Sequence, residues 1–439
     1  MTDSLQTDSP NPDSPTVELV VTGFANGGAG VARGDDGRVV FVAGALPGER
    51  VRARIDERKA AFARASAVAV LEPSPHRIDP TCPAAAAGAG CCDLSYVSAD
   101  YARELHAGVL ADVLTRIGGF GADAPPMPEV TRLAHGADGS VPDTGWRVRT
   151  RLAVDADGTV GVRARGSSRL ITVPCAAPVE GLLADAEALG ARPGSELVLA
   201  MGSDGRRHAA ELAPAAAGRR GARGGRRASA QRARHGAGAP RSTRLLDGAA
   251  DVTQTVGGHT WRVPVTGFWQ AHRDAPATYG AAVRRYVGGL DAPVGRGLRV
   301  WDLYGGVGVL GAALLDGDLA VDGIDLVETD PGALAAADRA LDGAPVTAHR
   351  GDTAAVIGGL RAPDVVIVDP PRRGAGAAVI AAIAAAGPRA VVHVGCDSAA
   401  FARDLRDWVA HGFRVTDWQG FDAFPGTHHM EAIALLESP

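Results

Sequence analysis

The residues best suited to covalent chemistry lie near the carboxyl end of the chain. Cys396 ends an apolar run, RAVVHVGC, and Glu431 stands directly before another, AIALL. A thiolate is a strong nucleophile and a carboxylate is a common general base, so this pair could attack an electron-poor carbon and later remove its proton. A cysteine in this position is otherwise usually a small buried hydrophobe. The case for chemistry at Cys396 therefore depends on the groups expected around it.

Four apolar segments between residues 298 and 369 end in glycine-rich or acidic sequence. Glycines after a strand let the backbone approach a ligand closely, and the helix that follows offers free N–H groups. An acid about twenty residues further on is well placed to hold ribose hydroxyls. One such acid could be a helix cap, but four in register favour a cofactor site. We therefore expect the carboxyl edge of a parallel sheet to bind a nucleoside-containing cofactor through Gly305, Gly306, Gly308, Glu328, Asp352 and Asp369.

Asp369 links this cofactor site to the nucleophile. It ends the run VVIVD, and two prolines stop the strand at the edge where open α/β sheets bind ligands. Cys396 is expected one strand further along, and Glu431 at the same edge. The set fits methylation of a uracil at C5, because C5 accepts a methyl group only after a nucleophile has added to C6. A base must then remove the C5 proton.

The composition is that of a soluble protein with more than one domain. The chain has 439 residues, 46% of them hydrophobic and 22% charged, and a length beyond about 300 residues favours two or three domains. No apolar run reaches the ~18 residues of a membrane span. Residues 1–15 are acidic and polar without the pattern of a secretory signal, so we expect a disordered tail on a cytoplasmic protein. The net charge of -5 gives no global sign of a nucleic-acid partner.

Residues 16–75 are expected to form a small β-barrel. Apolar and polar residues alternate in short runs, separated by glycine turns such as Asn26-Gly27-Gly28. The segments GGAGVAR and AGALPGERVRARI resemble a TRAM domain, an OB-like RNA-binding module of RNA-modifying enzymes. The resemblance implies that the barrel binds RNA, and a barrel used only for packing is the alternative.

Residues 76–260 are expected to form a β-rich central subdomain. An apolar stripe at helical spacing over residues 105–117 predicts a helix packed on the core. Further on, the pattern changes to strands with a hairpin turn at Asp157-Gly158. Residues 203–245 are rich in Gly, Ala and Arg, which predicts a disordered loop. That loop either binds along a phosphate backbone or is a spacer whose composition reflects a GC-rich genome.

Residues 261–439 alternate β and α patterns, which predicts a Rossmann-like domain with a parallel sheet. This domain carries the nucleophile, the base and the cofactor site. The fold class is therefore a multidomain α/β protein, with an OB-like barrel, a β-rich central subdomain and a C-terminal Rossmann-like methyltransferase domain.

Four segments carry a resemblance to a known family. DLYGGVG, VDPPRRG, VGCDSAAFARD and FDAFPGTHHMEAIALLE occur in this order, and TGFWQAHRDA precedes them. In these segments and over nearly its whole length, the chain resembles the RNA uracil-C5 methyltransferases that modify ribosomal and transfer RNA. The resemblance implies S-adenosylmethionine as the cofactor, Cys396 as the nucleophile and Glu431 as the proton acceptor. It implies that the cofactor is bound by Gln270, Tyr304, Glu328 and Asp369.

Two positions depart from the family pattern. Gly305 stands where the family usually has cysteine, and Asp397-Ser398 stand where it has asparagine-proline. We expect the first change to be harmless, whereas the second leaves the loop beside the nucleophile undefined. His428 and His429 are interpreted as structural or RNA-contacting groups, because adjacent histidines splay apart and no carboxylate completes a metal site.

The remaining four cysteines could bind a metal. Family members with a TRAM domain often hold a 4Fe-4S cluster through a C-x5-C-x2-C run and a distant fourth cysteine. Here TCPAAAAGAGCCDLS has Gly88 at the middle position and one extra cysteine. The resemblance and the number of cysteines favour a 4Fe-4S cluster, with zinc or no metal as alternatives. The expected ligands are Cys82, Cys91, Cys92 and Cys175.

Two other functions remain open. The first is a methyltransferase acting on an exocyclic or ring nitrogen of RNA, which needs no thiol. The second is a non-catalytic RNA-binding iron-sulfur protein built on a degenerate methyltransferase. In the favoured function the partner is rRNA or tRNA, the protein is a monomer, and no membrane is involved. The uracil must leave its stack, so we expect a single-stranded loop or a deformable stem as substrate.

Overall fold

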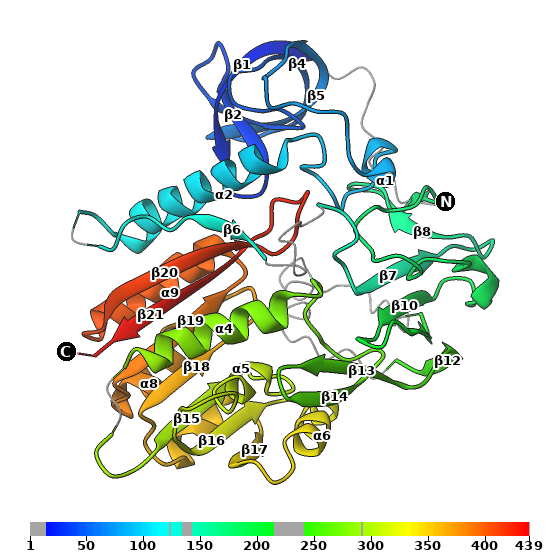
Figure 1. Ribbon diagram of the computed structural model, residues 1–439. Coiled ribbons are helices and arrows are strands. Elements are labelled where there is room, and N and C mark those ends of the chain that lie inside the picture. The colour runs from blue at the N-terminus through cyan, green and yellow to red at the C-terminus, as the bar shows by residue number, and fades with distance from the viewer. Residues whose placement is uncertain (1–14, 123, 134–142, 215–240, 291–292, 439) are drawn as a thin grey trace, which may run out of the picture.

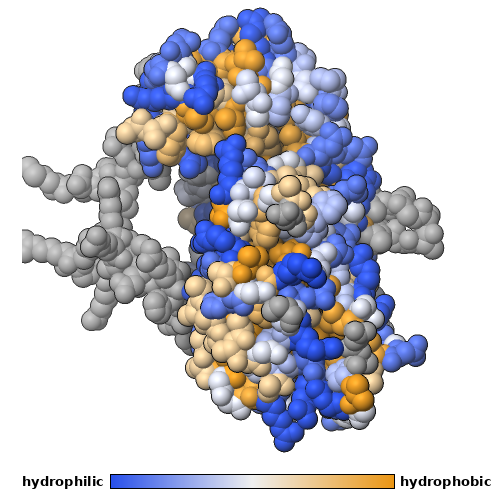
Figure 2. Space-filling model, turned by 90° about the vertical axis from the view of Figure 1, so that its left-hand side faces the viewer, coloured by the Kyte–Doolittle hydropathy of each residue, from blue (hydrophilic) through white to orange (hydrophobic). Residues whose placement is uncertain are grey.

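The computed structural model describes residues 15–122, 124–133, 143–214, 241–290 and 293–438. Most of the expected N-terminal tail therefore lies outside the described residues. Three bodies follow one another: a β-barrel, a six-stranded sheet and an eight-stranded sheet covered by helices (Figure 1). Hydrophilic and hydrophobic side chains are interspersed over the surface seen in Figure 2. No helix in the described part is long and apolar enough to span a membrane.

The N-terminal barrel closes as the alternating pattern predicts, in the strand order β1-β2-β3-β5-β4. Leu19, Val21 and Val42 are buried inside it, while the neighbouring Val20 faces outward. The turn between β1 and β2 needs glycine, because Gly28 has a φ of 80°. The strands are β1 (Thr16–Ala25), β2 (Ala29–Arg33), β3 (Val39–Ala43), β4 (Arg50–Arg58) and β5 (Phe62–Glu72).

The predicted core helix is α2 (Ala99–Val113), which follows the short helix α1 (Pro83–Ala86) and continues as a π turn. It packs against α9 (Ser398–Ala410) and β20 (Arg414–Asp422) of the catalytic domain. The strand β6 (Val130–Arg132) then pairs in parallel with β20. Assigning all of residues 76–260 to a central subdomain is therefore wrong for these elements. A strand of three residues carries too little pattern to reveal its partner.

The central sheet is antiparallel, in the order β12-β11-β10-β7-β8-β9, and the predicted turn at Asp157-Gly158 joins β7 to β8. The expectation of a disordered loop over residues 203–245 is wrong at both ends, because strands form there. Residues 215–240 lie outside the described residues. The strands are β7 (Arg149–Val154), β8 (Val160–Arg163), β9 (Leu170–Ile171), β10 (Glu196–Met201), β11 (Arg207–Leu212) and β12 (Thr243–Asp247).

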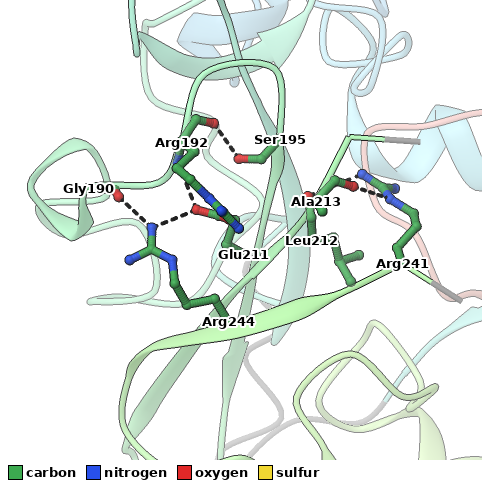
Figure 3. A network of polar contacts seen from close by, with 8 residues as sticks. All are labelled: Gly190, Arg192, Ser195, Glu211, Leu212, Ala213, Arg241 and Arg244. Atoms are coloured by element: carbon green, nitrogen blue, oxygen red, sulfur yellow. Dashed lines mark hydrogen bonds and ion pairs between the residues drawn. The ribbon is translucent and has the colours of Figure 1, made fainter. Parts of the chain in front are cut away.

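A buried carboxylate explains why β11 and β12 form in such an arginine-rich sequence. Glu211 is fully buried, and Arg192 and Arg244 hold its two oxygens at 2.5 and 2.6 Å (Figure 3). Burial alone would raise the pKa of Glu211, but the hydrogen bonds from these arginines lower it to about 2. Arg241 closes the same edge by donating to the carbonyl oxygen of Ala213. Arginine here satisfies buried acceptors, a role that composition alone does not reveal.

The catalytic sheet has the order β17-β16-β15-β18-β19-β21-β20-β6. Its strands from β15 to β19 are parallel, as predicted, and β21 returns antiparallel to β19. Helices cover both faces, so every residue of β18 and β19 is buried. The strands not yet given are β15 (Leu298–Leu303), β16 (Val321–Glu328), β17 (Val346–Arg350), β18 (Val365–Val368), β19 (Ala390–Gly395) and β21 (Glu431–Glu437).

The sheet of this domain separates its core into two halves. Val366 and Val368 face one core with Leu405 of α9, and Ile367 faces the other with Val283 of α4. A hairpin of β13 (Asp251–Val256) and β14 (His259–Pro264) precedes the domain. Its remaining helices are α4 (Ala275–Gly288), α5 (Val309–Ala312), α6 (Pro331–Ala340), α7 (Thr353–Val356) and α8 (Ala377–Ala385).

Candidate active site

Three strands bring Asp369, Cys396 and Glu431 to one edge of the catalytic sheet. Asp369 directly follows β18, the parallel neighbour of β19. β21 runs antiparallel to β19, with Gly395 opposite Ala432. The next pair in this register is Cys396 and Glu431, so the strand that ends at the cysteine lies beside the strand that begins at the glutamate. The three groups meet at the edge that the sequence predicts.

Burial raises the pKa of all three groups. Glu431 is 5% exposed, and burial followed by the nearby Asp369 raises its pKa well above the usual value. Burial also raises the pKa of Asp369 to about 7. For Cys396, burial and then the charges of Glu431 and Asp369 raise the pKa to about 12, although Arg372 opposes them. The thiol is therefore protonated near neutral pH until another group takes its proton.

A cavity of about 260 Å³ lies next to this edge. It is enclosed by the loop before α4, the turn after β15 and the ends of β16 and β18. Apolar side chains such as Pro276 and Leu310 form part of its wall, which is typical of a pocket for a small organic ligand. Six of the residues predicted to bind the cofactor line it: Gln270, Tyr304, Gly305, Gly306, Glu328 and Asp369.

The turn after β15 is held by the acid that follows it. Tyr304 and Gly306 have φ values of 56° and 58°, so the chain turns sharply at the cavity wall. Gly306 donates its backbone N–H to a carboxylate oxygen of Glu328 at 3.1 Å. The other oxygen of Glu328 accepts from the N–H of Asp330 at 2.9 Å. Glu328 therefore fixes the glycine turn and is itself held in place at the cavity.

Two predicted cofactor residues do not line the cavity. Gly308 is the N-cap of α5, with a φ of 80°, and packs near Leu341 and Leu326. Asp352 caps α7 by accepting from the N–H of Ala354 at 3.1 Å. Asp352 is therefore a helix cap in this structure, which is the alternative role considered above for each acid.

The glycine at position 305 is a packing requirement of this chain. A Cβ on Gly305 would lie 2.3 Å from Leu326 Cδ1 and 2.8 Å from Asp302 Cγ. Both neighbours are fully buried, so a side chain at position 305 would force them to move. The surroundings of position 305 are therefore packed for a glycine, and the expectation that the change is harmless stays a prediction.

The second departure from the family pattern defines the start of α9. Asp397 is the N-cap of this helix and accepts from the N–H of Ala400 at 2.8 Å. Aspartate is a strong N-cap, so Asp397 and Ser398 start the helix without the proline of the family pattern. The loop after Cys396 is consequently short and well defined.

The sequence prediction misses Tyr279. This residue lies on α4, is 1% exposed and lines the cofactor cavity. Its hydroxyl has no hydrogen-bond partner among the described residues. Burial raises its pKa well above the usual value, and Glu431, Asp369 and Cys396 add to the effect, so the phenol stays neutral. In the sequence Tyr279 belongs to the apolar face of a helix, where a tyrosine is normally interpreted as a core residue.

Side chains from the N-terminal half of the chain contact the loop before Glu431 and hold it in place. His106 on α2 lies 3.0 Å from the carbonyl oxygen of Thr427. Asp93 pairs with His428 at 2.6 Å, and a Cβ on Gly28 of the barrel would lie 2.8 Å from that histidine. His428 therefore has the structural role that was one of its two expected roles. The barrel touches the segment that leads to the candidate base.

Three of the four remaining cysteines converge although a long stretch of sequence separates them. The Sγ atoms of Cys82 and Cys92 each lie 3.9 Å from that of Cys175, and these three could hold one metal ion. Cys91 is not part of this close group among the described residues, although it is near enough to Cys92 and Cys175 to interact with them. The donor set fits a metal that prefers thiolates, namely zinc or an iron-sulfur cluster. A single zinc ion with Zn–S bonds of about 2.3 Å gives tetrahedral S–S edges of about 3.8 Å, so an iron-sulfur cube would need the thiols to spread.

Comparison with protein families gives two matches. Residues 15–68 match the TRAM domain, which covers the barrel. Residues 361–438 match the tRNA (Uracil-5-)-methyltransferase family, a range that contains Asp369, Cys396 and Glu431.

Two relatives extend the similarity over nearly the whole chain. An uncharacterized RNA methyltransferase of Corynebacterium efficiens is 42% identical over 98% of this chain and 97% of its own length. The 23S rRNA (uracil(1939)-C(5))-methyltransferase of Chromohalobacter salexigens is 33% identical over 97% of this chain and 90% of its own length.

A solved structure shares the fold. The tRNA (uracil-54, C5)-methyltransferase of Pyrococcus abyssi, in complex with S-adenosyl-L-homocysteine, aligns with a TM-score of 0.66 and 19% identity. The alignment covers 95% of this chain and 99% of that protein. The similarity therefore includes the barrel, the central sheet and the methyltransferase domain.

Proposed function

Because the chain belongs to the RNA uracil-C5 methyltransferase family, we propose that it methylates C5 of a uridine through a covalent bond between Cys396 and C6. S-adenosylmethionine is the methyl donor. The observation that carries the proposal is the register of β19 and β21, which sets Cys396 beside Glu431 with Asp369 one strand away. A nitrogen methyltransferase needs neither the thiol nor the second buried acid.

In the proposed mechanism the thiol of Cys396 first loses its proton to water, the thiolate adds to C6, and the electrons of the double bond move to give an enolate. C5 of the enolate takes the methyl group, and S-adenosylhomocysteine leaves with the electron pair of the broken sulfur–carbon bond. Glu431 in its ionised form accepts the C5 proton, the double bond re-forms and the thiolate departs from C6. Burial suits the ionised Glu431 to this step, because a carboxylate whose pKa is raised is a stronger base.

The reaction class is tested with RNA that carries tritium at C5 of uridine. We expect tritium to enter the solvent in the same molar amount as methyl groups enter the RNA. Methyl transfer without tritium release would support the nitrogen methyltransferase, and cofactor binding without any transfer would support the non-catalytic protein. Two of the proteins named above are a 23S rRNA and a tRNA methyltransferase, so cellular RNA containing both is the appropriate substrate.

Tyr279 is proposed as an additional cofactor-binding residue. Its side chain lines the cavity, and its neutral, buried hydroxyl has no partner among the described residues, so we propose that a polar group of the bound cofactor satisfies it. The variant Tyr279→Phe keeps the ring that packs against Phe421 at 5.5 Å and loses only the hydroxyl. We expect a threefold to tenfold weaker affinity for S-adenosylhomocysteine, the range of about one neutral hydrogen bond.

Isothermal titration measures this change, and Tyr286→Phe is the matched control. Tyr286 lies on the same helix and is equally buried but does not line the cavity, so its loss should leave the affinity unchanged. Equal affinities of Tyr279→Phe and the wild type would remove Tyr279 from the cofactor site.

We propose that Cys82, Cys91, Cys92 and Cys175 hold a 4Fe-4S cluster. The convergence of the thiols supports a metal, and the four cysteines match the number of irons to be ligated. The reaction requires no electron transfer, so the group would stabilise this part of the chain. Protein purified without oxygen is expected to contain iron and sulfide in equal amounts, and Cys175→Ala should lose both. Zinc in place of iron, or no metal, would contradict the proposal.

A further inference from the structure

A second, larger cavity lies beside the cofactor site. It has a volume of about 940 Å³ and runs between the central sheet and the loop over residues 266–269. Its wall is rich in arginine, with guanidinium groups from β7, β8 and the segments next to them. The arginines that line it are Arg147, Arg149, Arg151, Arg163 and Arg165.

The two acids that line this cavity already have partners. Glu196 pairs with Arg241 at 2.9 Å and with Arg151 at 3.9 Å. Asp330 caps α6 by accepting from the N–H of Gly332 at 2.7 Å. Among the described residues, Arg163 and Arg165 have no ion pair. The cavity therefore carries a net positive charge that its own acids do not neutralise.

Arg149, which also lines this cavity, likewise lacks a partner for part of its guanidinium group among the described residues. Its Nη2 donates to the carbonyl oxygens of Pro264 and Val265 at 3.0 and 2.5 Å. Its Nη1 is buried and has no acceptor in the described part of the chain. Burial and the neighbouring Arg151 lower the pKa of Arg149 to about 10, so the group is still charged at neutral pH. A buried cation with an unused donor is costly unless an anion meets it.

The cavity adjoins the cofactor cavity. Phe268, Trp269 and Asp330 line both this cavity and the cofactor cavity. Phe268 is 67% exposed where the two cavities adjoin. At the other end the wall includes Cys92 and Cys175 of the cysteine cluster.

We propose that this arginine-lined cavity binds the ribose-phosphate backbone of the RNA that flanks the methylated uridine. The inference rests on the proposed function, since the RNA that flanks the reacting uracil must lie on the protein surface outside the site where the base reacts. Each phosphate carries one negative charge. One guanidinium group that has no ion pair among the described residues, such as that of Arg163 or Arg165, can donate two hydrogen bonds to the same phosphate. The central subdomain thereby contributes to substrate binding through its own surface.

The test uses the double variant Arg163→Gln/Arg165→Gln. Both side chains are exposed and have no ion pair among the described residues, so folding should be unaffected. The control is Arg284→Gln/Arg414→Gln, an equal change of charge at exposed positions outside the cavity. The probe is a fluorescent single-stranded oligouridylate, and its dissociation constant is measured over a series of KCl concentrations.

We expect the test variant to bind the probe about fivefold to tenfold more weakly at physiological salt, and the control variant to bind like the wild type. The plot of log K against log salt should become less steep by about 1.4, because two phosphate contacts to a single strand are lost. With cellular RNA, half-maximal methylation should require correspondingly more RNA.

Affinity and salt dependence equal to those of the wild type would overturn the proposal, as would an equal loss in the control. Failure of the proposed function is distinguishable, because it would appear in the wild type as RNA binding without tritium release from C5. Binding of S-adenosylhomocysteine, measured on the same preparations, verifies that both variants keep an intact cofactor site.

Discussion

Replacement of Cys396 by alanine is expected to reduce methyl transfer roughly 10⁴-fold or more. Without the thiolate no bond forms at C6, and C5 of an unactivated uracil does not attack the methyl donor. Cys396 is absent from the lining of the cofactor cavity, so the variant should still bind S-adenosylhomocysteine. Cys396→Ser preserves the shape of the side chain but should be equally inactive, because a hydroxyl is a far weaker nucleophile. Activity near the wild-type level in Cys396→Ala would eliminate the C5 mechanism.

The same mechanism fixes the direction of the pH dependence. Burial, Glu431 and Asp369 raise the pKa of Cys396 to about 12, so only a small fraction of the free enzyme holds a thiolate at neutral pH. That fraction grows as the pH rises, and the rate of adduct formation should therefore increase between about pH 7 and 9.

Glu431→Gln is expected to give a different defect, a covalent complex that forms but does not resolve. Glutamine has nearly the same shape as glutamate but cannot accept the C5 proton. Removing this acid also removes a charge that raises the pKa of Cys396, so the attack on C6 should not be slowed. Turnover should fall by about 10²-fold to 10⁴-fold, the usual contribution of a general base.

The readout is a protein–RNA complex that survives denaturing electrophoresis with ordinary uridine in the RNA. Glu437→Gln is the matched control, because Glu437 ends the same strand at the far edge of the sheet. Wild-type turnover in Glu431→Gln, or loss of turnover without a trapped complex, would assign the base to another residue.

The sequence predicts the positions of candidate residues correctly where a strand end carries a distinctive residue. Asp369, Cys396 and Glu431 each terminate or begin an apolar run, and strand order at the carboxyl edge brings such residues together. The glycine turn at Gly305 and Gly306 can also be predicted from the sequence, because it stands between an apolar strand and a helix.

Other parts of the site depend on contacts that no local pattern encodes. Tyr279 projects from the buried face of a helix, and only the folded structure shows that its hydroxyl lacks a partner in the described part of the chain. The need for glycine at position 305 arises from Leu326 on the next strand. The arginines around Glu211 lie in a sequence typical of disorder, yet a single buried carboxylate makes two of them structural. Tertiary context overrides composition in each case.

The central claim, a covalent bond between Cys396 and the target base, is tested most directly with RNA that contains 5-fluorouridine. Fluorine cannot leave as a proton does, so the reaction should stop after methyl transfer with the base attached to the protein. We expect a stable complex in the presence of S-adenosylmethionine, with the modified peptide carrying the nucleotide on Cys396. No complex with an RNA that the enzyme methylates, or a nucleotide attached to another residue, would contradict the mechanism.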